Sequence, residues 1–188
     1  MKPPYFFGYG SLVNRETHAY GGAHRARLGG WRRIWRHTDL RPVAYLTAIP
    51  DSSCEIDGLI AHVPGNDWRA LDHRERAYER VAVCDQVSHP LPGPVSVAVY
   101  TVPDGKHGRP DREHPVLLSY VDVVVQGYLK EFGEPGVARF FDSTSGWSAP
   151  VLDDRAAPVY PRHQRLSPEE RGLVDDHLKR LGVVPITA

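Results

Sequence analysis

Residues 6–12 read Phe6-Phe7-Gly8-Tyr9-Gly10-Ser11-Leu12, a short apolar run followed by a turn of small residues. The run predicts a short buried strand and the glycines predict a turn after it. Such a turn exposes backbone N–H groups and lets a ligand approach the main chain closely. It is no dinucleotide fingerprint, because Val13 stands at the third glycine position, and no nucleophile elbow, because Ser11 lacks the Gly-x-Ser-x-Gly frame. Taken alone, the stretch favours an ordinary strand-to-turn connection.

The composition around this stretch is that of one globular domain. The chain has 188 residues, with 41% hydrophobic and 24% charged. Lys+Arg and Asp+Glu both total 23, so net charge gives no reason to expect nucleic acid or a membrane surface as partner. No signal peptide or membrane span is visible, and Cys54 and Cys84 make no disulfide framework. We expect a cytoplasmic protein.

Strand and helix patterns are mixed without a regular β-α-β rhythm, which favours the α+β class. Apolar runs predict strands at 26–36, 43–49, 56–63, 81–83 and 95–102, with a polar turn at 51–53. Helical patterns cover 68–78, 116–132 and a Ser167-capped segment to about Leu181. We expect a single domain over 1–188, partly irregular over 142–188.

Glu75 stands out in the expected helix 68–78. At about 100° per residue, Trp68, Leu71 and Tyr78 share one apolar stripe, and Glu75 lies inside it. A carboxylate in a core-facing stripe costs free energy unless it is paired or its pKa rises, and those conditions suit a general acid or base. The competing interpretation is a half-buried Glu75 neutralised by an arginine.

Periodicity does not choose Glu75 uniquely. Asp72 sits at the rim of the same stripe, and Glu79 joins it if the helix continues. Both therefore stay open as alternative acids at this stage.

Arginines and histidines suggest two further functions. Seven arginines between Arg15 and Arg41, interleaved with Trp31 and Trp35, are compatible with single-stranded nucleic acid. However, 19 of the 23 basic residues are arginine, so arginine is this chain's ordinary surface cation. The ten histidines show no His-Glu-x-x-His or Cys-x-x-Cys spacing, so we expect no metal unless ligands converge from distant segments.

Two motifs follow one another along the chain, Phe7-Gly8-Tyr9-Gly10-Ser11-Leu12 and Leu71-Asp72-x-Arg74-Glu75-x-x-Tyr78. In this order they resemble the γ-glutamylcyclotransferase superfamily, which includes AIG2-like and ChaC-like proteins. Gly30-Trp31-Arg32-Arg33 and the stretch 56–64 also match, so the resemblance covers roughly residues 5–83. It implies a small mixed β-barrel flanked by helices.

The resemblance also implies a reaction. In that family one glutamate, matched here by Glu75, takes a proton from the α-amino group of a γ-glutamyl substrate. The amine attacks its own γ-carbonyl, closes 5-oxoproline and expels the amine partner. The turn Tyr9, Gly10, Ser11 and Leu12 matches the substrate-holding loop, and Tyr78 is a further candidate for orienting substrate. The reaction needs no metal or organic cofactor.

Leu12 and the following Val13-Asn14 fit neither the branch that acts on γ-glutamyl amino acids nor the branch that acts on glutathione. The leaving group therefore stays open among an amino acid, glutathione, a polyamine and a modified lysine. The main alternative to this amide-cleaving acyltransferase or lyase is a non-enzymatic member of the fold that binds a small molecule.

Overall fold

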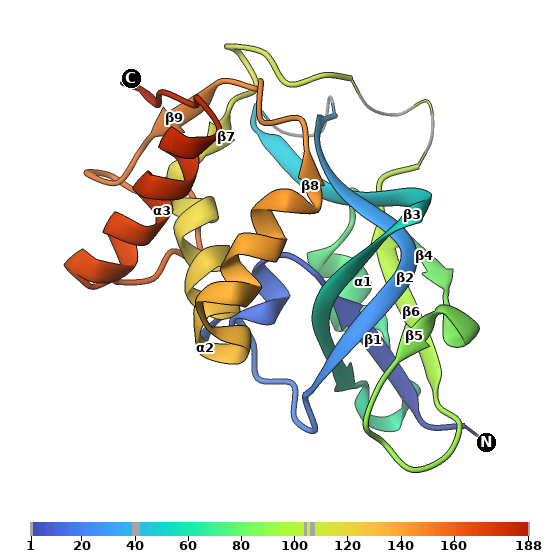
Figure 1. The fold of residues 1–188 in the computed structure, drawn as a ribbon. Coiled ribbons are helices and arrows are strands. Elements are labelled where there is room, and N and C mark those ends of the chain that lie inside the picture. The colour runs from blue at the N-terminus through green and yellow to red at the C-terminus, as the bar shows by residue number, and fades with distance from the viewer. Residues whose placement is uncertain (1, 39–41, 104, 106–107, 188) are drawn as a thin grey trace.

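A curled, mixed seven-stranded sheet forms the centre of the computed structural model, which describes residues 2–38, 42–103, 105 and 108–187. The strand order is β4-β6-β1-β3-β2-β5, with β8 paired to β2 (Figure 1). The strands are β1 (Pro4–Gly8), β2 (His24–His37), β3 (Ala44–His62), β4 (Glu79–Ala82), β5 (Val87–Ser88), β6 (Ser96–Thr101) and β8 (Thr144–Ser145). The sheet curls into a half-barrel with helices beside it, which confirms the predicted α+β fold.

The remaining elements flank this sheet. The short strands β7 (Val116–Leu117), β9 (Val151–Asp153) and β10 (Ile186–Thr187) form a separate parallel sheet. The α-helices of the described residues are α1 (Arg69–Arg74), α2 (Leu118–Asp142) and α3 (Pro168–Arg180). Figure 1 shows α2 and α3 side by side, away from β4 and β6. None of the described helices is long and apolar enough to cross a membrane.

The C-terminal helix begins where its sequence predicts. The Ser167 hydroxyl accepts the Glu170 N–H at 3.2 Å, and the Glu170 carboxylate accepts the Ser167 N–H at 2.8 Å. This reciprocal capping box satisfies two amide donors at the start of the helix. Together with Pro168 in the first turn, it fixes the start of α3.

The two strands expected at 43–49 and 56–63 are one strand, β3, so the predicted turn at 51–53 is wrong. Pairing with β2 steps from Gly29↔Glu55 to Trp31↔Pro50, which leaves the polar residues in a bulge. Inside the bulge Asp51 accepts hydrogen bonds from the N–H and hydroxyl of Ser53, at 3.0 and 2.6 Å. The long partner strand carries β3 through a sequence that otherwise favours a turn.

The helix expected over 116–132 starts two residues later and continues farther. Val116 and Leu117 pair with β9 instead. The first segment of α2 stops at Gly133, whose φ of 66° favours glycine, and a second segment then runs to Asp142. The valines of 121–125 are at most 1% exposed, so burial outweighs their weak helix propensity.

Strand β1 separates two apolar clusters because its side chains alternate between the faces of the sheet. Phe7 packs into the large core with α2, whereas Phe6 packs with Leu71 of α1. The turn that follows β1 therefore lies where both clusters meet. This position sets the place of the candidate site.

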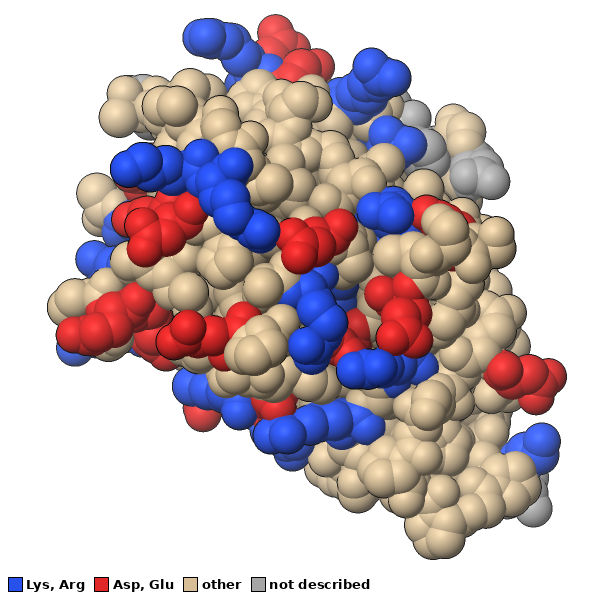
Figure 2. Space-filling view, in the orientation of Figure 1, with Lys and Arg blue, Asp and Glu red and all other residues tan. Residues whose placement is uncertain are grey.

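Most described arginines of the arginine-rich stretch are paired with carboxylates of the protein itself. Arg15 pairs with Glu131 at 2.5 Å and Arg32 with Asp51 at 2.7 Å. Trp31 and Trp35, the aromatic rings between these arginines, are only 6% and 1% exposed, so they offer no open faces for stacking bases. Arg41 lies outside the described residues. On the face drawn in Figure 2, acidic and basic side chains are interspersed.

Candidate active site

Glu75 caps the end of a short helix and does not sit within a long one. The predicted helix 68–78 is wrong in extent, because α1 ends at Arg74 and Glu75 has the non-helical dihedrals φ −98° and ψ 29°. The Glu75 N–H still bonds the carbonyl of Leu71, and its own carbonyl accepts the N–H of Tyr78, both at 2.8 Å. Pairing of Glu79 and the rest of β4 with β6 ends the helix by tertiary contact.

The Glu75 side chain nevertheless lines a cavity, and it is 17% exposed. The cavity has two adjoining parts that share Ser11, Leu46, Glu75, Tyr78 and Tyr120. The part at the glycine turn is lined by all six predicted site residues: Tyr9, Gly10, Ser11, Leu12, Glu75 and Tyr78. The other part, of about 90 Å³, is called the Arg162 side here, and it is also lined by Val43, Ala44, Arg74, Leu117, Tyr160 and Arg162.

The two alternative acids lie elsewhere. Asp72 accepts a hydrogen bond from the Tyr100 hydroxyl, and its carboxylate is 3.3 Å from Arg80. Glu79 is exposed on β4. Neither residue lines either part of the cavity, so the structure favours Glu75 among the three carboxylates.

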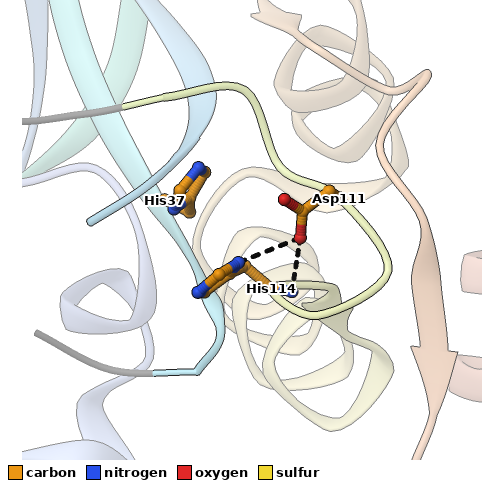
Figure 3. A group of neighbouring side chains, drawn as sticks. All are labelled: His37, Asp111 and His114. Atoms are coloured by element: carbon orange, nitrogen blue, oxygen red, sulfur yellow. Dashed lines mark hydrogen bonds and ion pairs between the residues drawn. The ribbon is translucent and has the colours of Figure 1, made fainter. Parts of the chain in front are cut away.

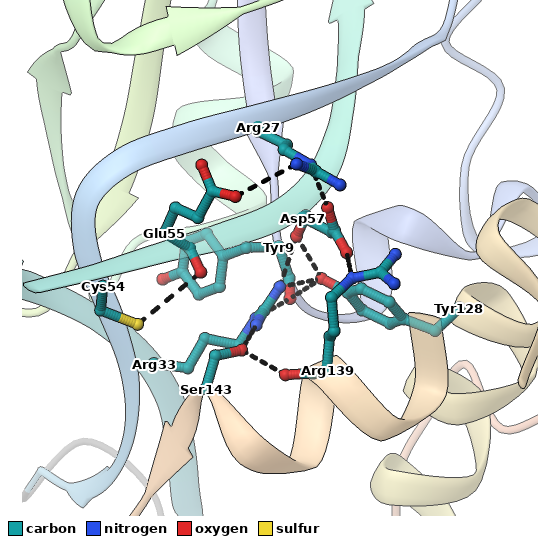
Figure 4. Close-up of polar contacts among 9 residues, drawn as sticks. All are labelled: Tyr9, Arg27, Arg33, Cys54, Glu55, Asp57, Tyr128, Arg139 and Ser143. Atoms are coloured by element: carbon teal, nitrogen blue, oxygen red, sulfur yellow. Dashed lines mark hydrogen bonds and ion pairs between the residues drawn. The ribbon is translucent and has the colours of Figure 1, made fainter. Parts of the chain in front are cut away.

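The main chain of the glycine turn is held from behind by buried side chains. The Tyr9 carbonyl accepts a hydrogen bond from Nε of Arg33 and one from the Tyr128 hydroxyl, both at 3.0 Å (Figure 4). The Tyr9 hydroxyl donates to the Tyr100 carbonyl at 2.6 Å. Both ends of Tyr9 are therefore fixed before any ligand arrives.

Arg33 is fully buried, and its guanidinium bonds neutral oxygens in the described residues. Besides Tyr9 it donates to the Asp57 carbonyl, the Tyr128 hydroxyl and, at 2.7 Å, the Ser143 hydroxyl. The Asp57 carboxylate instead forms ion pairs with Nε of Arg27 at 3.0 Å and with Nε of Arg139 at 2.6 Å (Figure 4). Burial raises the pKa of Tyr128 to about 12, so its hydroxyl stays a donor at neutral pH.

Gly10 is required because Tyr120 occupies the space a side chain would need. A Cβ atom built on Gly10 lies 2.6 Å from the Tyr120 hydroxyl oxygen but 3.8 Å from the carbon that bears it. Burial, followed by electrostatic interaction with Tyr160, Tyr9 and Glu75, holds the pKa of Tyr120 well above its usual range. The hydroxyl is therefore neutral beside the turn.

Arg74 connects the glycine turn to the candidate base. Its Nε is 3.1 Å from the Glu75 carboxylate, and its side chain is 11% exposed. The same guanidinium donates to the Thr17 carbonyl at 3.0 Å and lies 3.5 Å from the Ser11 hydroxyl. A half-buried carboxylate beside an arginine is also what the competing, purely structural interpretation of Glu75 expects. The cavity is what distinguishes the two.

The hydroxyls of Tyr9 and Tyr78 are engaged by the protein. Tyr78 donates to the Leu46 carbonyl at 3.0 Å. Burial raises the pKa of both tyrosines, and the negative charge of Glu75 acts in the same direction. Both remain neutral at physiological pH, so neither competes with Glu75 as an anionic base.

Comparison with known proteins agrees with this arrangement. The model of the family described as gamma-glutamyl cyclotransferase, AIG2-like, matches residues 6–122. The chain belongs to that family. No curated protein matches the sequence. The matched region of this family member includes the glycine turn, Glu75 and Tyr120.

Solved structures share the fold at low sequence identity. One named gamma-glutamyl cyclotransferase has a TM-score of 0.57 at 13% identity, covering 92% of this chain and 98% of its own. The uncharacterized protein loc79017 from Homo sapiens has a TM-score of 0.58 at 14% identity, covering 93% and 99%. YkqA from Bacillus subtilis has 0.57 at 17%, covering 78% and 57%. These likenesses establish the fold of this family member.

Several residues of the site escaped the sequence argument. Arg74 belongs to the second motif, but the sequence argument assigns it no role. Tyr120 lies in the expected helix 116–132, and the sequence does not show which side of that helix meets the site. Tyr160 and Arg162 come from a stretch without regular structure. Because such loops carry no periodic signal, only the fold brings these residues to Glu75.

Proposed function

We propose that this protein is a γ-glutamylcyclotransferase that closes a γ-glutamyl group to 5-oxoproline and releases the amine partner. The observation that carries the proposal is the Glu75 carboxylate, which lines the same cavity as the turn Tyr9–Leu12. Membership of the gamma-glutamyl cyclotransferase family supports it.

Glu75 acts as the general base in this proposal. Its carboxylate takes a proton from the substrate's α-amino group, and the freed nitrogen attacks the γ-carbonyl carbon. The C–N bond to the amine partner then breaks, and Glu75 returns the proton to the departing nitrogen. Atoms and charge balance without a co-reactant, and one positioned acid–base group is enough for both transfers.

The glycine turn holds the reacting group in a bent conformation. Ring closure is unimolecular, so positioning accounts for much of the acceleration. The backbone N–H groups of the turn stabilise the oxygen that gains negative charge as nitrogen adds to the γ-carbonyl. Arg33 and Tyr128 fix this backbone, so little reorganisation accompanies the reaction.

The test measures 5-oxoproline released from γ-glutamyl amino acids, glutathione, a γ-glutamyl polyamine and a γ-glutamyl lysine. Glu75→Gln keeps the side-chain volume but cannot accept the proton, so we expect turnover to fall by about 10²–10⁴. Asp72→Asn is the matched control, because Asp72 is on the same helix but outside the cavity. It should retain near wild-type turnover.

Three outcomes contradict the proposal. A folded Glu75→Gln variant with wild-type turnover removes Glu75 from the base role. Loss of activity in Asp72→Asn but not Glu75→Gln transfers the role to Asp72. A wild-type protein that binds γ-glutamyl compounds without releasing 5-oxoproline from any of them is a binding protein of this fold.

A further inference from the structure

A second group of chemically reactive side chains lies away from Glu75. His37 at the end of β2 meets Asp111 and His114 of the loop before β7, and one ligand atom from each residue lies within 4.8 Å of the other two (Figure 3). Sequence spacing does not reveal this group because His37 is remote from the other two along the chain. We propose that these three residues bind a divalent transition-metal ion of the Zn²⁺ type.

The polar atoms of the group are incompletely satisfied without an ion. Nδ1 of His37 is buried and has no hydrogen-bond partner among the described residues. The two imidazole rings stack with centroids 4.3 Å apart and planes at 19°. Because the ring faces contact one another, any partner of a ring nitrogen must approach it at the edge of its ring. An unmet buried nitrogen is unfavourable, and coordination to a metal would satisfy it.

Asp111 is already oriented for this role. One carboxylate oxygen accepts the N–H groups of Glu113 and His114, at 3.0 and 2.9 Å, and lies 2.9 Å from Nδ1 of His114. Its second oxygen is turned towards His37 (Figure 3). Hydrogen bonds of this kind orient metal-binding carboxylates and imidazoles.

The donor set decides the class of ion. Two imidazole nitrogens and one carboxylate suit zinc and its neighbours in the transition series, whereas Mg²⁺ and Ca²⁺ prefer oxygen ligands alone. Zinc bonds to nitrogen and oxygen are about 2.0–2.2 Å in a tetrahedral arrangement, so two ligand atoms of one ion lie about 3.3–3.6 Å apart. Rotation of the half-buried His114 and the exposed Asp111 side chains towards His37 closes the gap from the present separation of up to 4.8 Å.

The ion would fasten the edge of the cavity. His37 pairs with Ala44 in the sheet and exchanges backbone hydrogen bonds with Gly108. The Ala44 N–H donates to the Pro115 carbonyl at 2.9 Å. Ala44 and Leu117 both line the Arg162 side of the cavity. A metal bridge between His37 and the 111–114 loop therefore supports the cavity rim from outside and leaves the reacting group untouched.

The experiment titrates the tag-free, metal-depleted protein with Zn²⁺ against a chromophoric chelator and follows the melting temperature. We expect one saturable site. At a free Zn²⁺ concentration 100 times the Kd, the Tm should rise by roughly 5–10 °C. His37→Gln and Asp111→Asn should each weaken Zn²⁺ binding by at least about tenfold. His73→Gln, an exposed histidine outside the cluster, should bind as the wild type does.

Absence of saturable Zn²⁺ binding overturns the proposal. Binding that survives in His37→Gln overturns it as well, because the ion would then rest on the loop alone. Asp111→Asn separates loss of a metal ligand from loss of the fold, because Asp111 is exposed and its substitution leaves His37 and the end of β2 intact. Equal loss of affinity in His73→Gln would place the ion elsewhere.

Discussion

Nε of Arg33 donates a 3.0 Å hydrogen bond to the carbonyl oxygen of Tyr9, so a buried cation holds the main chain of the proposed glutamyl-binding turn. The charge is stabilised by neutral oxygens and by the ring faces of Tyr128 and Phe140, whose centroids lie 5.0 and 5.3 Å away. Such an arrangement uses the planar fork of arginine, which an ammonium group cannot reproduce. Arg33 is a positioning residue in this scheme.

Arg33→Lys should therefore weaken both the fold and the reaction. A lysine keeps the charge but cannot reach every acceptor, and each buried oxygen left unmet costs about 1–3 kcal/mol. We expect a lower free energy of unfolding and a raised KM, measured by denaturant unfolding and by 5-oxoproline release. Arg32→Met is the control, because Arg32 forms a surface ion pair with Asp51, and such pairs are screened by solvent and contribute little to stability. Equal effects in both variants would contradict the special role of Arg33.

Gly10→Ala should lower stability and activity because its new methyl group meets the Tyr120 hydroxyl. Tyr120→Phe in the same chain removes that oxygen and leaves ordinary contact distances, so the double variant should regain most of the lost Tm. Activity provides a separate readout, since in the proposed mode of binding a Cβ atom at Gly10 also approaches the substrate. A double variant as unstable as Gly10→Ala would show that Tyr120 is not what the methyl group meets.

Arg162→Gln should discriminate between leaving groups. Arg162 lines the cavity together with Tyr160, and its side chain has no ion-pair partner among the described residues. It therefore favours amine partners that carry a carboxylate. We expect kcat/KM to fall several-fold for glutathione and γ-glutamyl amino acids, and to stay constant for γ-glutamyl polyamines. A uniform loss across all substrates would contradict this role.

His18 should make the turn sensitive to acid. Its Nδ1 accepts the Tyr20 N–H at 3.2 Å, so the neutral ring carries its proton on Nε2, which faces the Leu12 carbonyl at 3.0 Å. Burial, and then the charges of Arg74 and Arg15, lower the pKa of His18 below its usual 6.5. The unfolded chain therefore binds the proton more readily than the folded one.

The stability that neutral His18 contributes is thus present above pH 6.5 and is lost as the pH falls below it through the lowered pKa. One proton changes the free energy of unfolding by at most about 1.4 kcal/mol per pH unit. His18→Gln keeps one donor and one acceptor but does not titrate. The loss of unfolding free energy between pH 7 and pH 5 should therefore be smaller in this variant than in the wild type, and its Tm should vary less. His73→Gln should behave as the wild type.

Extensive chelation should leave turnover intact. The proposed reaction uses Glu75 and backbone donors, and the proposed metal cluster lies at the cavity rim. Removing a bound ion should lower Tm while 5-oxoproline release stays near the untreated value under conditions where the protein is folded. Loss of turnover, restored by one added divalent ion, would assign the metal to the chemistry.

The sequence predicted most elements of the fold but misjudged their limits where tertiary contacts decide them. The capping box of Ser167 is local and is confirmed. No local sequence signal marks the end of α1 at Arg74. The helix ends there because the following residues of β4 pair with β6. In the same way, the long partner strand β2 carries β3 through polar residues that resemble a turn.

The candidate site was predicted in part for a related reason. Glu75 and the glycine turn carry short motifs, and the structure brings them to one cavity. Arg33 and Tyr128 support that turn from β2 and α2, and neither position is distinguished by periodicity. Convergence of His37 with Asp111 and His114 likewise depends on strand pairing. Contacts between remote segments are what single-sequence patterns leave out.

The walls of the cavity come from segments as distant as Ser11 and Arg162. A chain still leaving the ribosome has therefore made its base and its glycine turn long before it has a complete pocket. Contacts of such long range form late, because loop closure is unfavourable until the surrounding structure is in place. A ligand that fills this pocket recognises only the finished molecule, and its binding draws incompletely folded chains towards the native state.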